Sequence, residues 1–345
     1  MRKLLLAPLF IASAASAQPD FAVKYNLLMN STDQGYLKAD GQDDPSQLNT
    51  LAMKSYLEMN GENKGVSYSI AVNLMAGNFS DAVEMALVTK SFGDLSLSVG
   101  KGYVNSGGYD NYNAYYDINI YNQNTNNHIF NWGVADLAQV DYTMGNHTLT
   151  VQVANDVVAA TGDGTNPCSD SARVCGRYNT ENKQPAVLLQ YKGEFSGLTP
   201  LVQIVSSDSG HSMETVLGLE YEIAKFSGHF DYVMHSIGYK VSNTEYTDKV
   251  SAMSLLVRYD LGTMQPWLKY LAYDVKQDGT DLTGNSDRSS LDDNHAGFQL
   301  GMDFPQGENF IPYVELAQQS QTVTEAGNDE SLTESTIVVG VKGSL

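Results

Sequence analysis

The chain has 345 residues, a formal net charge of -20 and a mean hydropathy of -0.27. So acidic a chain would repel the phosphates of nucleic acid, which argues against a nucleic-acid partner. The length and hydropathy suit a soluble protein of several domains as well as a barrel in which only every second strand residue faces lipid, so neither decides the fold class.

The first residues have the pattern of a secretory signal. Arg2 and Lys3 precede a short apolar core at 4–12, and Ala-Ser-Ala at 15–17 is a small-residue cleavage site. The apolar run is too short to span a bilayer. We therefore expect a signal peptide over 1–17 and export of the mature chain.

The mature sequence then repeats one pattern, in which apolar and polar residues alternate over a stretch and a turn or loop follows. Alternation with period two predicts β-strands, and about ten residues is the length that a tilted strand needs to cross the hydrocarbon layer. We expect about sixteen strands, at 21–30, 50–60, 66–76, 81–90, 94–104, 131–144, 147–157, 184–193, 199–207, 212–223, 226–237, 249–260, 263–274, 294–304, 309–319 and 335–345.

The connections between these segments alternate in length. One set is short, at 61–65, 91–93, 145–146, 194–198, 224–225, 261–263 and 305–308. The intervening set is mostly long, at 31–49, 105–130, 158–183, 238–248, 275–293 and 320–334, with short exceptions near 77–80 and 208–211. Short turns at one rim and long loops at the other are typical of bacterial outer-membrane barrels. The predicted fold is therefore all-β: a transmembrane antiparallel β-barrel over 18–345, with short periplasmic turns and long extracellular loops.

Aromatic residues give an independent indication of the same fold. Seven of them lie beside short turns and, by alternation, on the apolar face of their strands. Such a ring is expected where amphipathic side chains meet the headgroups of the membrane. The seven are Tyr142, Tyr191, Tyr221, Phe226, Tyr259, Phe304 and Phe310.

The polar face of the strands would line the interior. Lys24, Lys54 and Lys342 fall on neighbouring strands once the last strand closes against the first, either as a basic ladder or as three separate solubilising lysines. Arg258 and Lys269 also point inward, on adjoining strands. The other inward polar positions are Asn26, Glu58, Ser67, Ser69, Asn73, Glu84, His229 and Asp231.

With its signal, strand count, loop alternation and amphipathic last strand, the chain resembles the sixteen-stranded general diffusion porins of Gram-negative bacteria over essentially its whole mature length. The resemblance implies a water-filled channel in the cell outer membrane for passive diffusion of small hydrophilic solutes and ions. It also implies a homotrimer in contact with outer-membrane lipid and lipopolysaccharide, without a cofactor. The acidic net charge favours a mild preference for cations.

In that family the loop between the fifth and sixth strands folds into the lumen and narrows it. The segment 105–130 has the matching position here, as a candidate constriction loop. Asp110 and Asp117 would then face the lysine ladder. Tyr115 and Tyr116 allow a second interpretation, in which the loop binds sugars. The alternative is an external loop with no role in the pore.

The sequence departs from the family pattern at two places. Members usually end in Phe, whereas this chain ends in Leu345. The short connection near 77–80 corresponds to a loop that often locks the family's trimer, so trimerisation is a weaker expectation here.

The cysteines, Cys168 and Cys175, lie in a polar stretch. In an exported protein they predict a small loop disulfide, and they lack the neighbouring ligands of a zinc site. The acidic stretches 40–44 and 276–295 read as solvated loops rather than calcium loops.

Three alternatives compete with the general channel. In an enzyme, Ser227, His229, Asp231 and His235 would be the candidate site, but residues two apart on one strand point in parallel and do not make a nucleophile–base chain, so we expect no catalysis. A substrate-selective channel, for example for sugars, and an exported soluble β-rich binding protein are the others.

Overall fold

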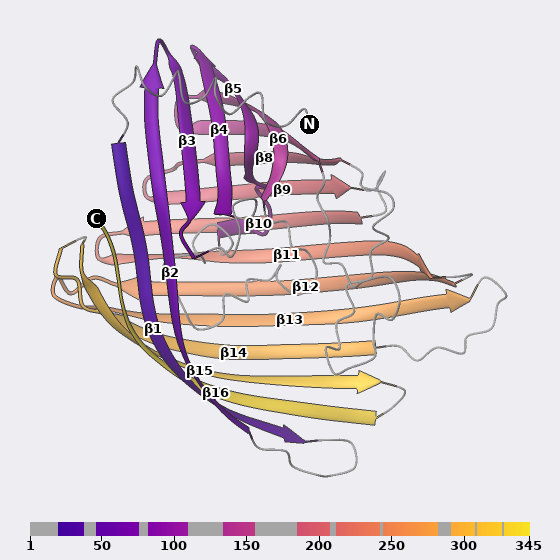
Figure 1. Ribbon diagram of the computed structural model, residues 1–345. Coiled ribbons are helices and arrows are strands. Elements are labelled where there is room, and N and C mark those ends of the chain that lie inside the picture. Colours follow the sequence, from indigo (N-terminus) through magenta and orange to yellow (C-terminus); the bar gives the residue numbers. More distant parts are fainter. Residues whose placement is uncertain are drawn as a thin grey trace.

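The computed structural model describes residues 20–37, 46–75, 82–109, 134–155, 185–207, 212–241, 244–281, 291–307, 309–325 and 328–345. Sixteen strands of this part of the chain form one closed antiparallel barrel, each paired with its neighbours in sequence and β16 with β1 (Figure 1). This confirms the predicted fold class. Within the same ranges, no helix is long and apolar enough to cross a membrane.

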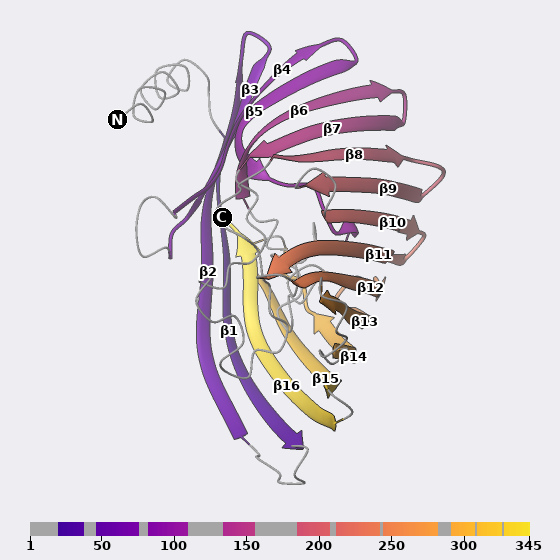
Figure 2. The ribbon, with the colours of Figure 1, turned by 90° about the vertical axis from the view of Figure 1, so that its right-hand side faces the viewer.

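The strands in chain order are β1 (Asp20–Leu37), β2 (Ser46–Asn63), β3 (Val66–Asn73), β4 (Val83–Phe92), β5 (Leu95–Tyr103), β6 (Val134–Met144), β7 (His147–Asn155), β8 (Ala186–Gly193), β9 (Leu198–Ser207), β10 (Ser212–Ile223), β11 (Phe226–Val241), β12 (Thr244–Tyr259), β13 (Gln265–Asp281), β14 (Leu291–Asp303), β15 (Ile311–Glu325) and β16 (Asn328–Ser344). All sixteen predicted segments overlap these strands. The connections β6–β7, β8–β9 and β10–β11 are short and lie along one edge of the barrel, which we call the short-turn rim (Figure 2).

Four predicted long loops were wrong in extent, because the flanking strands take up more than half of each. β1 runs to Leu37 and β2 starts at Ser46, inside 31–49, and β13 runs to Asp281 and β14 starts at Leu291, inside 275–293, so both ends of the acidic stretch 276–295 are strand. β11 runs to Val241 and β12 starts at Thr244, so most of 238–248 is strand, and β15 and β16 likewise take up most of 320–334. The pairing continues in register to the last residues, as in Tyr239 with Tyr246. These extensions carry Tyr, Thr and Val, which favour strands even where apolar alternation has ended.

The barrel closes at the very end of the chain. The backbone N–H of Leu345 donates to the carbonyl of Val23, and the N–H of Val23 donates to Leu345, both at 2.9 Å. The terminal Leu that departs from the family pattern is therefore itself paired with β1.

Alternation sorts the side chains of each strand between two environments. Along β8, Ala186, Leu188 and Gln190 are buried and point inward, while Val187 and Leu189 are 48% and 47% exposed on the outside. Near the short-turn rim several outward positions are aromatic, and the rings of Phe226 and Tyr259 lie 4.7 Å apart across β11 and β12.

Aromatic rings on the strands cover glycines of the neighbouring strand. Tyr313 on β15 is the cross-strand partner of Gly340, and Trp267 on β13 is the partner of Gly301. A Cβ at either glycine would overlap the ring, so only glycine lets the ring lie flat against the sheet. Such pairs of an aromatic ring and a glycine help to fix the strand register in a barrel whose strands do not pack against a hydrophobic core on both faces.

Candidate functional site

The inner face of the barrel has an apolar part that is larger than alternation alone suggested. It lies on β6 to β13, toward the rim opposite the short turns, and it also includes Val104 from the segment that follows β5. Its buried members are Val104, Ala135, Leu137, Ala154, Ala186, Leu188, Val205, Val216, Val233, Val250, Ala252 and Tyr273. The packing of Val104 into this cluster shows that the chain enters the barrel directly after β5.

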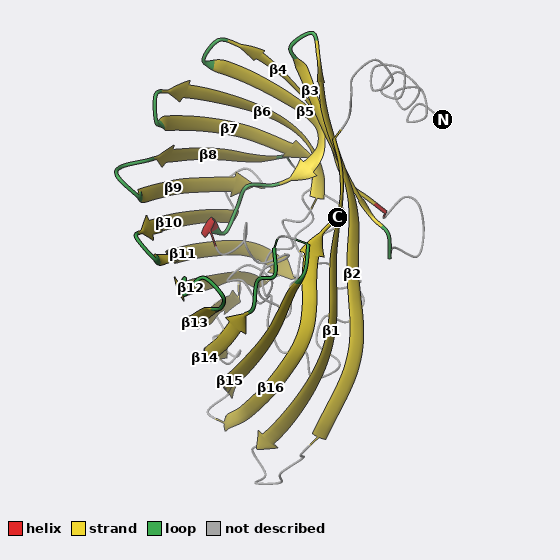
Figure 3. Cartoon of the chain, turned by 90° about the vertical axis from the view of Figure 1, so that its left-hand side faces the viewer, coloured by secondary structure: helices red, strands yellow, loops and turns green. Residues whose placement is uncertain are grey.

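The six residues from Val104 to Tyr109 lie against the inner wall. The N–H of Gly107 donates to Oε1 of Glu214 on β10 at 3.0 Å, and the N–H of Tyr109 donates to Oδ1 of Asp231 on β11 at 3.0 Å. In Figure 3 this segment is the green stretch that leaves β5 and ends at the short red turn beside β10. The start of the predicted constriction loop therefore lies inside the barrel, along the wall formed by β7 to β11.

Two glutamines of the wall hold the beginning of this segment. Gln152 on β7 accepts the N–H of Asn105 at 3.1 Å and donates to the carbonyl of Tyr103 at 3.2 Å. Gln203 on β9 donates to the carbonyl of Asn105. Because an amide side chain carries both a donor and acceptors, it can pair with either kind of backbone group.

The two carboxylates that hold the end of the segment are fully buried. Glu214 and Asp231 are each 0% exposed, and Nδ1 of the buried His235 lies 3.6 Å from Oε2 of Glu214. A buried carboxylate is costly unless it is hydrogen-bonded or paired. The backbone N–H groups of the segment supply such bonds, so the wall and the segment stabilise each other.

The conformation of the segment requires glycine at its tightest point. Gly107 and Gly108 have φ of 75° and 74°, in the left-handed region that side chains rarely adopt. A Cβ at Gly108 would also collide with the Asp231 carboxylate and lie 3.0 Å from Cγ1 of Val216. The backbone can therefore approach β10 and β11 only because this position has no side chain.

Tyr109 ends the described part of the segment. Its hydroxyl donates to the carbonyl of Thr199 at 2.8 Å, and Nζ of Lys192 lies 5.1 Å from the centre of its ring. Burial, with the nearby charges of Glu220 and Asp231, raises the pKa of the Tyr109 phenol. The hydroxyl thus stays a neutral hydrogen-bond donor.

A cavity of about 690 Å³ opens at the short-turn rim on the same side of the barrel. It is lined by the ends of β7 to β12, and its charged or titratable lining residues are Lys192, Glu194, Glu220, Glu222, His229 and Arg258. Lys192 lies 3.9 Å from Glu220, with both side chains about half exposed. Lys192 and Glu220 also lie near Tyr109, so the segment 104–109 ends beside two side chains that line the cavity.

The three lysines of the predicted ladder come together at the seam between the chain ends. Asn26 on β1 is the cross-strand partner of both Lys54 and Lys342, and Lys24 lies two residues from it. Lys24 pairs with Glu58 at 2.8 Å and Lys342 with Asp303 at 3.0 Å. The side chain of Lys54 lies outside the described atoms. The two described lysines are thus already neutralised by wall carboxylates.

Arg258 and Lys269 lie on adjoining strands, as expected, but in different surroundings. Arg258 is at the short-turn rim and lines the cavity. Lys269 is 2% exposed in the middle of the inner wall.

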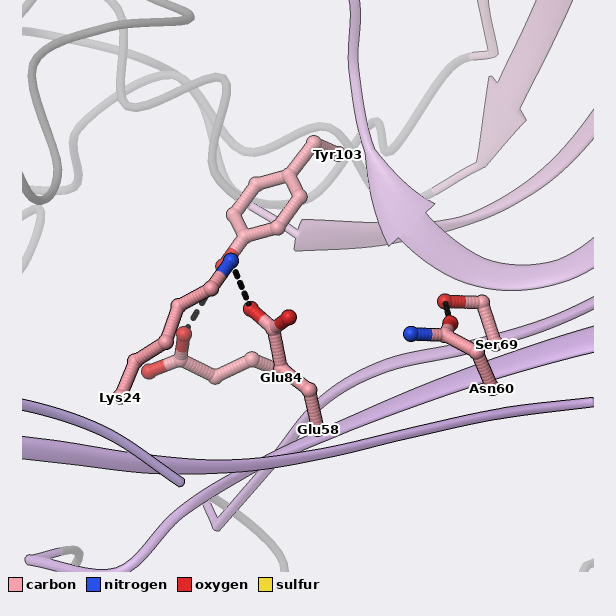
Figure 4. A network of polar contacts seen from close by, with 6 residues as sticks. All are labelled: Lys24, Glu58, Asn60, Ser69, Glu84 and Tyr103. Carbon is pink, nitrogen blue, oxygen red and sulfur yellow. Dashed lines mark hydrogen bonds and ion pairs between the residues drawn. The ribbon is translucent and has the colours of Figure 1, made fainter. Parts of the chain in front are cut away.

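A second polar group lies on the first five strands. Figure 4 shows Lys24 reaching Glu58, and Tyr103 reaching Glu84. Glu84 also accepts from Nδ2 of Asn73 at 3.0 Å. The register of the β3–β4 pairing shifts between Ala71 and Val72. Because of this shift, alternation alone does not place Glu84 on the inner face, where the sequence pattern predicted it.

Several predicted site residues fall outside the described residues: Asp110, Tyr115, Tyr116 and Asp117 of the loop, Cys168 and Cys175, and the segment 1–17. Conversely, Gln152, Gln203 and Glu214 were not predicted as functional. Each is a large polar residue at an inward position of its strand, which was the available signal. In the part of the chain that the structure describes, no three His, Cys, Asp or Glu side chains are grouped to hold a metal ion.

Comparison with known proteins relates this geometry to other barrels. No family model and no curated relative matches the sequence. Among solved structures, OmpT, an outer membrane protein of Vibrio cholerae in a trimer form, is 12% identical with a TM-score of 0.53, over 93% of this chain and 99% of that one. The anion-selective porin from Comamonas acidovorans is 13% identical with a TM-score of 0.55, over 94% and 100%. Salmonella typhi OmpF, in complex with daunomycin, is 12% identical with a TM-score of 0.53, over 93% and 97%.

Identities this low establish a shared fold and leave the function to be argued from the residues. The chain has the fold of porin-like barrels over nearly its full length and nearly the full length of each of these structures.

Proposed function

We propose that this protein is an outer-membrane porin that passes small hydrophilic solutes and ions by diffusion and performs no catalysis. The observation that carries the proposal is the anchored segment 104–109. A barrel without a transport role has no need of a segment bonded to its inner wall, whereas a segment held there limits the size of the solutes that pass through a channel.

The outer surface supports a membrane location. Large apolar side chains are exposed on the outward face of nearly every strand, among them Met29 at 62%, Val99 at 60% and Phe298 at 56%. A soluble protein rarely exposes a continuous apolar surface of this kind, and a lipid-facing barrel requires it. This disfavours the soluble binding protein.

The inward charges support a mild cation preference. Among the inward side chains that the structure describes, carboxylates outnumber cations: Glu58, Glu62, Asp141, Glu214, Glu220, Glu222, Asp231, Asp303, Glu315 and Glu334 against Lys24, Lys192, Arg258, Lys269 and Lys342. A lumen of one prevailing sign concentrates counter-ions. The similar barrel from Comamonas is anion-selective, so the preference follows from side chains and not from the fold.

Two of the residues considered for catalysis make other contacts on the wall. Asp231 binds the backbone of Tyr109, and His235 lies beside Glu214. Neither is oriented as the partner of a nucleophile at Ser227. This favours the non-enzymatic function.

The remaining parts of the proposal follow from the porin architecture. They are cleavage of a signal over 1–17, a loop disulfide between Cys168 and Cys175, a homotrimer, and contact with lipid and lipopolysaccharide. The loop 105–130 is the proposed constriction, with Asp110 and Asp117 facing the lysines of the seam. A sugar-selective channel is the second candidate, because the aromatic ring of Tyr109 lies beside the cavity.

Liposome swelling tests the proposal. Liposomes that contain the refolded protein should swell in isotonic solutions of small sugars, at rates that fall steadily as the solute grows. Swelling with one sugar alone would favour the selective channel. No swelling with any solute, from protein whose heat-modifiable gel migration proves a folded barrel, would contradict both.

A further inference from the structure

The cavity at the short-turn rim carries charges of both signs. Lys192 on β8 and Arg258 on β12 are its cations, and Glu220 on β10 lies between them on the wall. A mild preference for cations does not require these opposite charges to share one cavity.

The charges are placed so that a solute can reach them. Lys192 and Glu220 are 46% and 40% exposed, and their atoms are 3.9 Å apart, at the limit of an ion pair. Exposed pairs of this kind contribute little to stability, so a solute can displace Lys192 from Glu220 at little cost. Arg258 lines the same cavity, two strands away from Glu220.

A solute with a single charge is not well matched to this lining. A small anion attracted by Arg258 also meets Glu220 and Glu222, and a small cation attracted by Glu220 also meets Lys192 and Arg258. A solute with both charges is attracted at both ends. Across the sheet, the backbones of Glu220 and Arg258 are two strand spacings apart, about 10 Å. Arg258 lies level with Glu222, across Ser227, and Glu220 lies one inward position further from the short-turn rim, so a small solute can contact Arg258 and Glu220 at different depths of the cavity.

The polar lining supplies further hydrogen bonds. Thr148, Thr199 and Ser227 also line the cavity. Arg258 offers a planar fork of donors that suits a carboxylate, and Glu220 accepts from an ammonium group.

We propose that this cavity is a weak binding subsite for small zwitterionic solutes of the amino-acid kind, with the carboxylate at Arg258 and the ammonium group at Glu220. The inference rests on the proposed channel, since the solute would reach the cavity along the lumen.

Matched probes test the subsite by the ion current through single channels in a planar bilayer. Glycine carries both charges, glycinamide only the positive one and N-acetylglycine only the negative one. Glycine should reduce the current in a saturable manner, and the two blocked forms should do so much less at the same concentration.

Two variants locate the effect. Arg258→Gln and Glu220→Gln should each raise the half-blocking concentration of glycine about tenfold, the equivalent of one charge-assisted hydrogen bond. Lys276→Gln is the control, because Lys276 is 62% exposed beside Asp274 near the opposite end of β13 and does not line the cavity. It should leave the half-blocking concentration unchanged.

The outcomes separate the subsite from the channel. The subsite is overturned, and the channel stands, if the channel conducts but glycine does not reduce its current. The same holds if glycinamide or N-acetylglycine reduces the current as well as glycine does. Absence of conductance overturns the channel. In that case saturation-transfer NMR of glycine with the micelle-folded barrel still tests the subsite, and no difference between the native protein and Arg258→Gln would overturn it.

Discussion

A few residues determine where the chain goes after β5. Gly107 and Gly108 allow the turn, and Glu214 and Asp231 accept the backbone N–H groups that the turn presents. Each of these contacts joins residues more than a hundred positions apart in the sequence. The path of the segment therefore depends on single side chains of the opposite wall.

Gly108→Ala should displace the segment from the wall. The added methyl group would overlap the Asp231 carboxylate, in addition to the left-handed strain of about 1–2 kcal/mol. Gly93→Ala is a matched control, since Gly93 has a φ of 63° with nothing within 4 Å of the added Cβ. Single-channel noise should rise in the first variant and not in the second. Equal noise in the two would show that the contact with Asp231 does not position the segment.

Asp231→Ala should release the end of the segment. Loss of the acceptor for the Tyr109 N–H removes a charge-assisted hydrogen bond of about 1.5–3 kcal/mol. Hydrogen exchange of the Tyr109 amide should accelerate roughly tenfold or more, whereas Asp136→Ala, on the exposed outward side of β6, should not change it. An unchanged exchange rate in Asp231→Ala would contradict the anchoring.

At the scale of elements, the seam between the chain ends is held across four strands. Lys342 on β16 passes 5.3 Å from the centre of the Tyr313 ring on β15 and pairs with Asp303 on β14. The Tyr313 hydroxyl donates to Oδ1 of Asn26 on β1 at 2.8 Å. Side chains thus reinforce the one pairing that joins the first strand to the last.

Lys342→Met should destabilise the barrel strongly. It leaves the Asp303 carboxylate buried without its cation, a loss of about 3–5 kcal/mol in buried pairs. Lys24→Met removes the pair with Glu58, whose side chains are 37% and 18% exposed, and should cost about 0–1 kcal/mol. The temperature at which the folded band disappears in a gel measures both. A similar drop of this temperature in the two variants would show that the Lys342–Asp303 pair does not stabilise the seam more than an exposed pair does.

The elements were largely predictable, and the tertiary contacts were not. Alternation and the position of turns predicted all sixteen strands, because a strand of the barrel has one apolar and one polar side. The polar extensions, such as that of β11 to Val241, have no such contrast and were read as loops. The anchors Gln152, Gln203 and Glu214 were missed because inward polar residues are common and only folding shows which of them meet the segment after β5.

The barrel as a whole combines an apolar outer surface with an interior that is divided rather than uniform. An apolar part on β6 to β13 is partly covered by the segment 104–109, and charged side chains line the rest of the wall and the cavity at the short-turn rim. The excess of inward carboxylates predicts a reversal potential that indicates cations permeate more readily than anions in a salt gradient. An anionic preference would contradict the charge argument and leave the channel itself intact.

Single-channel recording of the refolded protein in a planar bilayer tests the proposed channel most directly. We expect discrete, repeated conductance steps in simple salts from protein that shows the heat-modifiable migration of a folded barrel. A verified barrel that inserts and gives no conductance steps would contradict the proposed channel.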